Sequence, residues 1–65
     1  MYTVKVIQAN TNTLVNEEKF EKPIPAVVDF DNKLAKFGIK TWHNCSPNHM
    51  VGISDSGMMV LLIED

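Results

Sequence analysis

The sequence predicts a small α+β domain, in which one amphipathic helix covers one face of a mainly antiparallel sheet of three to four strands in the order β-α-β-β-β. Three observations support this prediction. A run rich in β-branched residues opens the chain, a helical stripe of apolar residues occupies its middle, and six consecutive apolar residues nearly close it. The 65 residues suffice for one core only, so residues 1–65 are expected to form a single small domain.

The first expected strand covers residues 3–9, where Val4 and Val6 share a face with Tyr2. Residues 10–13 are asparagine and threonine, whose side chains bond to their own backbone and favour a turn. Two alternatives remain for the next segment. Either Leu14 and Val15 begin a short strand that forms a hairpin with the first, or residues 14–22 form an irregular loop.

A helix is expected from residue 26 onward, with Pro23 and Pro25 at its beginning. Proline suits the first turn of a helix because its missing N–H has no partner there. The apolar residues that follow are spaced three, four and three apart, which places them on one buried stripe. These residues are Val27, Phe30, Leu34 and Phe37.

Polar residues of this helix lie off the stripe. Asp29 and Lys33 are four residues apart and are expected to pair, which stabilises an exposed helix by about 0.2–0.5 kcal/mol. Gly38 is expected to end the helix in the left-handed conformation that glycine adopts easily.

The second half of the chain is expected to be mostly strand. Residues 39–45 form the next strand, with His43 and Cys45 on one face and Trp42 on the other. Residues 46–49 interrupt it, and residues 50–54 form a short strand. Residues 55–57 (Asp-Ser-Gly) then make a hairpin turn into the last strand.

The last apolar run is the strongest indication of an interaction surface. A strand with one wet face alternates apolar and polar residues, and this run does not, so it needs cover on both faces. The helix supplies one cover and a second copy or a target protein is expected to supply the other. A lysine at Met58 or Leu62 is therefore expected to weaken association by burying an unpaired charge. The predicted interface residues are Met58, Met59, Val60, Leu61, Leu62 and Ile63.

Composition excludes several classes of protein. The net charge is −2, all six basic residues are lysines, and arginine is absent, which disfavours direct nucleic-acid binding. One cysteine permits no intrachain disulfide, and the apolar runs are too short to cross a membrane. The start of the chain lacks the pattern of a signal peptide. We therefore expect a complete, cytoplasmic protein without a membrane partner.

Residues 42–49 concentrate the reactive side chains, and a metal site is the first interpretation. His43, Cys45 and His49 offer the imidazole and thiolate ligands that zinc prefers. Structural zinc sites usually close with four such ligands, and this segment has three. The sequence therefore predicts no metal and no cofactor.

Nucleophilic catalysis is the second interpretation, with Cys45 as nucleophile and His43 or His49 as base. Such a site also needs an orienting group and a pocket that excludes water. A chain of this length with one helix has little depth for that pocket, so we expect a protein that is not an enzyme.

Recognition is the third interpretation. Tryptophan supplies a large contact area and a donor N–H, and it is enriched among interface hot spots. The competing explanation is that Trp42 fills the core beneath the helix. The predicted binding residues are Trp42, His43, Asn44 and His49.

These patterns predict a non-enzymatic protein-interaction module that self-associates and acts as a regulator or inhibitor of another macromolecule. A phage-encoded protein directed at a host enzyme or defence system is the concrete form of this hypothesis. The alternative is a protein that binds or sequesters a small, nucleotide-type ligand in a pocket at a subunit interface.

Overall fold

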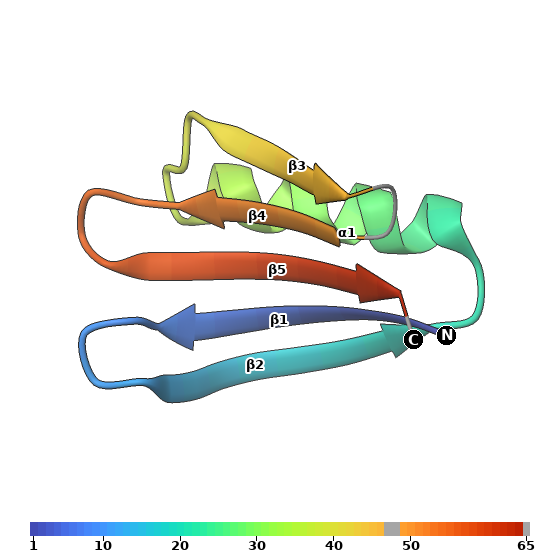
Figure 1. The fold of residues 1–65 in the computed structure, drawn as a ribbon, viewed down its shortest axis with the longest axis horizontal. Coiled ribbons are helices and arrows are strands. Elements are labelled where there is room, and N and C mark those ends of the chain that lie inside the picture. The colour runs from blue at the N-terminus through green and yellow to red at the C-terminus, as the bar shows by residue number, and fades with distance from the viewer. Residues whose placement is uncertain (47–48, 65) are drawn as a thin grey trace.

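The computed structural model describes residues 1–46 and 49–64, with the side chains of residues 45 and 46 left aside. Five strands form a single sheet, and one helix covers one face of that sheet (Figure 1). This arrangement confirms the predicted α+β class. The elements are β1 (Tyr2–Gln8), β2 (Thr13–Phe20), α1 (Pro23–Lys36), β3 (Trp42–Ser46), β4 (His49–Ile53) and β5 (Met58–Glu64).

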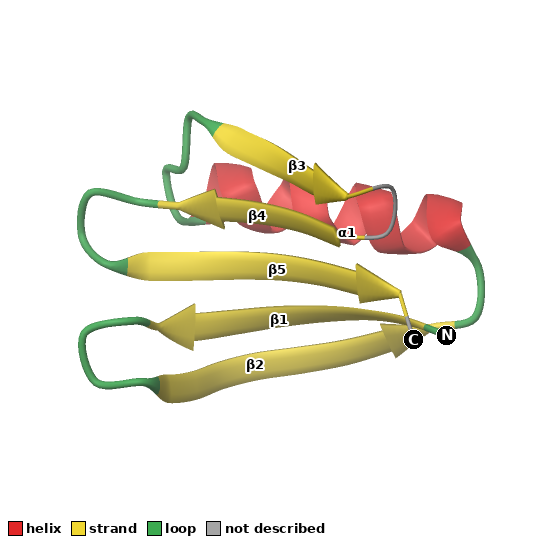
Figure 2. Ribbon diagram, viewed as in Figure 1, coloured by secondary structure: helices red, strands yellow, loops and turns green. Residues whose placement is uncertain are grey.

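All neighbouring strands are antiparallel, and the sheet order is β2-β1-β5-β4-β3. The first and last strands therefore lie side by side at the centre. Helix α1 connects the two edge strands β2 and β3 and lies along one face of the sheet (Figure 2). Its backbone comes near β1 and β5, and its side chains also reach β3 and β4. The opposite face of the sheet carries no element of this chain among the described residues.

The sequence prediction left β2 open as either a short strand or a loop, so the predicted three to four strands fall short of the five in the structure. The hairpin alternative is the correct one, although the strand runs much further than Leu14 and Val15. Its side chains are exposed at every position except the half-buried Phe20. Pairing with β1 holds this segment extended, and a side-chain pattern cannot reveal a strand that buries almost nothing.

The core lies between α1 and the face of β1 and β5 that the helix covers. Val4, Val6 and Val60 are fully buried there, and Phe30 from the helix packs against them. Four further buried apolar residues complete this core: Ala26, Leu34, Ile39 and Leu62.

The buried side of α1 differs in part from the predicted stripe. Phe30 and Leu34 are buried as expected, whereas Val27 is 43% exposed and its neighbour Ala26 is fully buried. The helix begins at Pro23, so both prolines lie in its first turn as expected, and the small Ala26 is the first buried residue of the helix. Lys33, predicted to lie off the stripe, is buried because carboxylates accompany its ammonium group.

The end of the helix follows the expected glycine termination. Gly38 has φ +69°, its N–H donates to the carbonyl of Ala35, and the N–H of Ile39 donates to the carbonyl of Leu34. This pair of bonds satisfies the last carbonyl groups of the helix and brings the side chains of Ile39 and Leu34 together in the core. Ile39 therefore belongs to the helix termination, and the strand predicted from residue 39 begins only at Trp42.

The turn between β4 and β5 forms as predicted. Gly57 has φ +89°, the N–H of Ser54 donates to the carbonyl of Met58, and the N–H of Met58 donates to Ser54 Oγ. The N–H of Ala9 donates to the carbonyl of Gly57, which ties this turn to the turn between β1 and β2. The break predicted between β3 and β4 falls largely on residues 47 and 48, outside the described residues.

Candidate interaction site

The face of the sheet opposite α1 carries both apolar and polar side chains, and we call it the open face. Strand register aligns its side chains in rows across the sheet. Leu61 of β5 lies between Lys5 of β1 and Val51 of β4, and His43 of β3 follows Val51 in the same row. The apolar residues of the open face are Ile7, Leu14, Val51, Ile53, Met59, Leu61 and Ile63.

Most of these apolar side chains are half-buried by their neighbours in the sheet, and Leu14 and Ile53 are more than half exposed. Charged residues border them on the β2 side, where Lys5 Nζ lies 3.7 Å from Glu17 Oε1. An apolar centre with a charged border is the usual composition of a protein–protein interface.

Strand alternation divides the six predicted interface residues into two sets. Met58, Val60 and Leu62 point to α1, and Val60 and Leu62 lie in the core. Met59, Leu61 and Ile63 point to the open face, where a partner can reach them. The variants first expected to test association, at Met58 and Leu62, would therefore disturb the core of the chain itself.

The four predicted binding residues also divide between the two faces. The ring of Trp42 packs edge-to-face against Phe30 of α1, with ring centroids 6.2 Å apart and planes at 87°. Asn44 shares this side of the sheet because it pairs with Met50, which packs against the core. Both alternatives for Trp42 apply in part, since it contacts a core residue and is still 46% exposed.

His43 and His49 lie on the open face instead. His43 pairs with Val51, and His49 pairs with Ile63. One protomer therefore does not bring Trp42 and the histidines together around a single ligand. The side chain of Cys45 lies outside the described set, and the described residues contain no group of three metal-ligating side chains.

An apolar cleft lies beside Trp42 on the helical side of the molecule. Its volume is about 180 Å³, and its walls come from α1, β3 and β4. Val27 and Val28 are largely exposed on one wall, opposite Trp42 and Met50. The sequence prediction missed this cleft because it placed Val27 in the core. The lining residues are Val27, Val28, Phe30, Asp31, Leu34, Trp42 and Met50.

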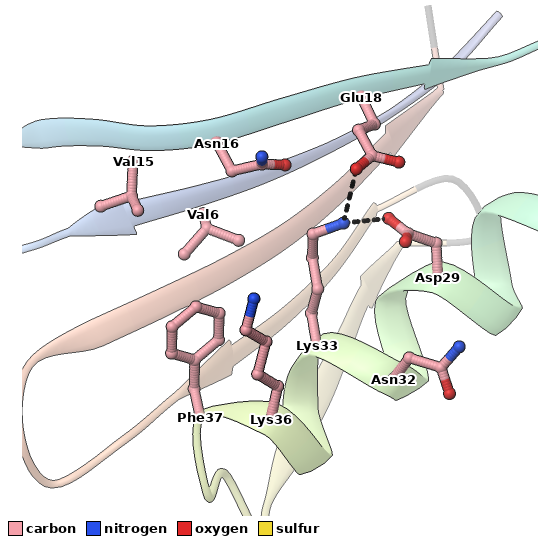
Figure 3. Close-up of a pocket in the computed structure, with 9 residues that line it drawn as sticks. All are labelled: Val6, Val15, Asn16, Glu18, Asp29, Asn32, Lys33, Lys36 and Phe37. Carbon is pink, nitrogen blue, oxygen red and sulfur yellow. Dashed lines mark hydrogen bonds and ion pairs between the residues drawn. The ribbon is translucent and has the colours of Figure 1, made fainter.

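A larger, polar cavity of about 340 Å³ lies between α1 and β2 (Figure 3). Lys33 projects into it and forms ion pairs with Asp29 of the same helix and with Glu18 of β2, whose Oε1 lies 3.5 Å from Lys33 Nζ. This confirms the predicted pairing of Asp29 with Lys33. Two carboxylates surround one ammonium group, so the charge of Lys33 is compensated and the ion pairs tie the helix to β2.

One titratable side chain, that of Tyr2, has a raised pKa for a local reason. The pKa of the Tyr2 hydroxyl lies above its usual value because the carboxylate of Glu64, its neighbour across β1 and β5, accepts its hydrogen bond. This pair lies at an end of the central strands.

No helix in the described part of the chain is long and apolar enough to cross a membrane. Comparisons of the chain with protein-family models, with curated proteins and with solved structures each found no match.

Proposed function

We propose that this protein is a non-enzymatic interaction module that self-associates through its open face and acts by occupying another macromolecule. The observation that carries the proposal is the uncovered apolar part of the open face, where Met59, Leu61 and Ile63 of the central strand are partly exposed in a single copy. Contiguous apolar surface of this kind on a small protein usually marks an interaction site.

The size of the face suits a second copy of the same chain. The two longest dimensions of the molecule, 30 and 21 Å, span the plane of the sheet in Figure 1, so the open face is small. Stable interfaces begin near 600 Å² on each partner. A face-to-face pair must therefore use nearly the whole face, and we expect a reversible dimer rather than a permanent one.

Self-association also suits the small core. A domain of this length buries only about 60% of the surface that its unfolded chain exposes, so its stability is modest. Covering the open face removes further apolar area from water and stabilises the folded state by mass action.

Light scattering across a range of protein concentrations tests the proposal. We expect the mass to approach twice the 7.3 kDa of one chain as concentration rises. Met59→Lys places a charge on the open face and should keep the protein monomeric, with Met59→Gln as a milder second variant. Ile24→Lys is the matched control, because Ile24 is exposed on α1 and lies outside the open face. A parent protein that stays monomeric at every concentration would contradict the proposed self-association.

A further inference from the structure

The cleft beside Trp42 lies on the side of the molecule opposite the open face. Its walls include Val28 of α1, and α1 covers the face that a dimer partner would not touch. In a face-to-face dimer both copies would therefore keep this cleft accessible on the outer surfaces. A second contact surface remains available for a different partner.

Asp31 is the single charged residue that lines this cleft. Its neighbours three and four positions away along α1 are all apolar: Val27, Val28, Leu34 and Ala35. No ion pair to Asp31 occurs within the described residues, and nearby Lys33 pairs with Asp29 and Glu18 instead. The cleft thus combines apolar walls with one uncompensated carboxylate.

We propose that this cleft binds a segment of a partner protein in which an arginine stands beside a large apolar side chain. The cleft has room for one such apolar side chain between Val28 and Trp42. Guanidinium groups bind carboxylates through two parallel hydrogen bonds and also stack on tryptophan, so one arginine can satisfy both Asp31 and the exposed part of Trp42. This inference rests on the part of the proposed function in which the protein occupies another macromolecule.

Charge decides between a protein and a nucleic acid as occupant. A nucleic acid would bring phosphates toward the Asp31 carboxylate, where like charges repel. A basic, partly apolar protein segment brings the complementary charge, and complementary charge gives specificity and a faster association rate.

The only tryptophan of the chain lies in the cleft, so its fluorescence reports binding directly. The probe is a random peptide library displayed on phage and selected on the intact protein. We expect the selected peptides to pair arginine with a leucine, methionine or aromatic residue. After resynthesis, these peptides should change the Trp42 emission on titration.

Two variants test the assigned chemistry. Asp31→Asn keeps the shape of the side chain and removes its charge, so we expect the affinity for the selected peptides to fall about tenfold. Val28→Glu places a second carboxylate on the apolar wall, so the apolar side chain of the peptide can no longer be buried there. We therefore expect peptide binding to be lost. Glu21→Gln is the control, because it removes a carboxylate outside the cleft and should leave the affinity unchanged.

Three results would overturn the inference: no enrichment of peptides, enriched peptides without a basic residue, or equal affinity for the parent and Asp31→Asn. A shift of Trp42 emission with uncharged phosphatidylcholine vesicles, but not with peptides, would assign the cleft to lipid and would also overturn it. Repeating the titration with Met59→Lys separates the two proposals. If Met59→Lys is monomeric and still binds the peptides, the cleft binds them without self-association. If the parent protein dimerises but binds no peptide, the cleft inference fails while the proposed self-association stands.

Discussion

Gly52 of β4 lies directly beneath Leu34 of α1, so closely that a Cβ atom on residue 52 would stand 2.5 Å from Leu34 Cδ2. A second contact, at 3.2 Å, would form with Ile39 Cγ2. Real Cβ atoms do not approach other carbons this closely, so the glycine permits the helix termination and the sheet to pack together. The absence of a side chain at residue 52 is thus a feature of the core rather than of a turn.

Gly52→Ala should lower the free energy of unfolding by about 1–3 kcal/mol, because the added methyl group overpacks the contact with Leu34. Combining it with Leu34→Ala should cost less than the sum of the two single effects, since the new methyl group then fills part of the space left by the leucine. Urea unfolding at one fixed protein concentration measures all three variants.

Gly38→Ala is the control for this prediction. No atom lies within 4 Å of a Cβ built on Gly38, and the cost there comes only from its φ of +69°. We expect a loss of about 1 kcal/mol from the backbone conformation alone, without overpacking of Leu34. Additive behaviour of Gly52→Ala with Leu34→Ala would contradict the close contact.

The ion pairs of Lys33 should contribute unequally. Asp29 is the closer and less exposed carboxylate, whereas the side chain of Glu18 is 49% exposed and lies 3.5 Å from the ammonium group. Glu18→Gln should therefore change the free energy of unfolding by at most about 1 kcal/mol, and sodium chloride should reduce its effect further. Asp29→Asn should cost more, because it leaves the buried Lys33 with one distant partner.

Lys33→Met provides the matched test of this cluster. It keeps the apolar stem and removes the buried charge, so we expect it to be less destabilising than Asp29→Asn. Chemical denaturation at low and high salt measures the three variants. If Lys33→Met were the most destabilising of the three variants, the prediction would be wrong. The ion pairs would then stabilise the fold more than expected for partly exposed carboxylates.

The edge-to-face contact of Trp42 with Phe30 should show energetic coupling. In a double-mutant cycle with Trp42→Leu and Phe30→Leu, we expect about 0.5–1.5 kcal/mol of interaction beyond the separate losses of buried area. Circular dichroism follows unfolding in every member of the cycle, including those without tryptophan. A coupling near zero would mean that the contact with Phe30 adds nothing to the packing of Trp42 beyond buried area.

The elements with strong burial patterns could be predicted from the sequence. Phe30 and Leu34 at helical spacing, Gly38 at the helix end and the run from Met58 each follow from periodicity or backbone preference alone. β2 could not be predicted, because Leu14 and its neighbours bury almost nothing and are held by pairing with β1.

The candidate surfaces were predictable to a smaller extent. The need for cover on both faces of β5 follows from the sequence, but which residues face outward depends on register, and a shift of one residue exchanges the faces. Separation of Trp42 from His43 follows from strand alternation. The cleft depends on where α1 crosses the sheet, which exposes Val27 and buries Ala26, and no local pattern in the sequence fixes that crossing.

Leu61 and Leu62 are adjacent in β5 and should respond oppositely to the same substitution. Leu62 is 4% exposed beneath α1, so Leu62→Lys buries an unpaired charge and should remove about 3 kcal/mol or more of stability, enough to unfold much of so small a domain. Leu61 is half-buried at the centre of the open face, where a lysine can extend its stem along the surface and keep its charge in water.

Leu61→Lys should therefore retain the circular dichroism spectrum and thermal unfolding transition of a folded monomer while its mass in light scattering stays at that of one chain. Leu62→Lys should lose the folded spectrum at every concentration. If Leu61→Lys is folded and still dimerises as the parent does, the open face is not the self-association surface. If both variants unfold, Leu61 contributes to the core, and Met59→Gln, which adds no charge, then decides whether the open face mediates the association.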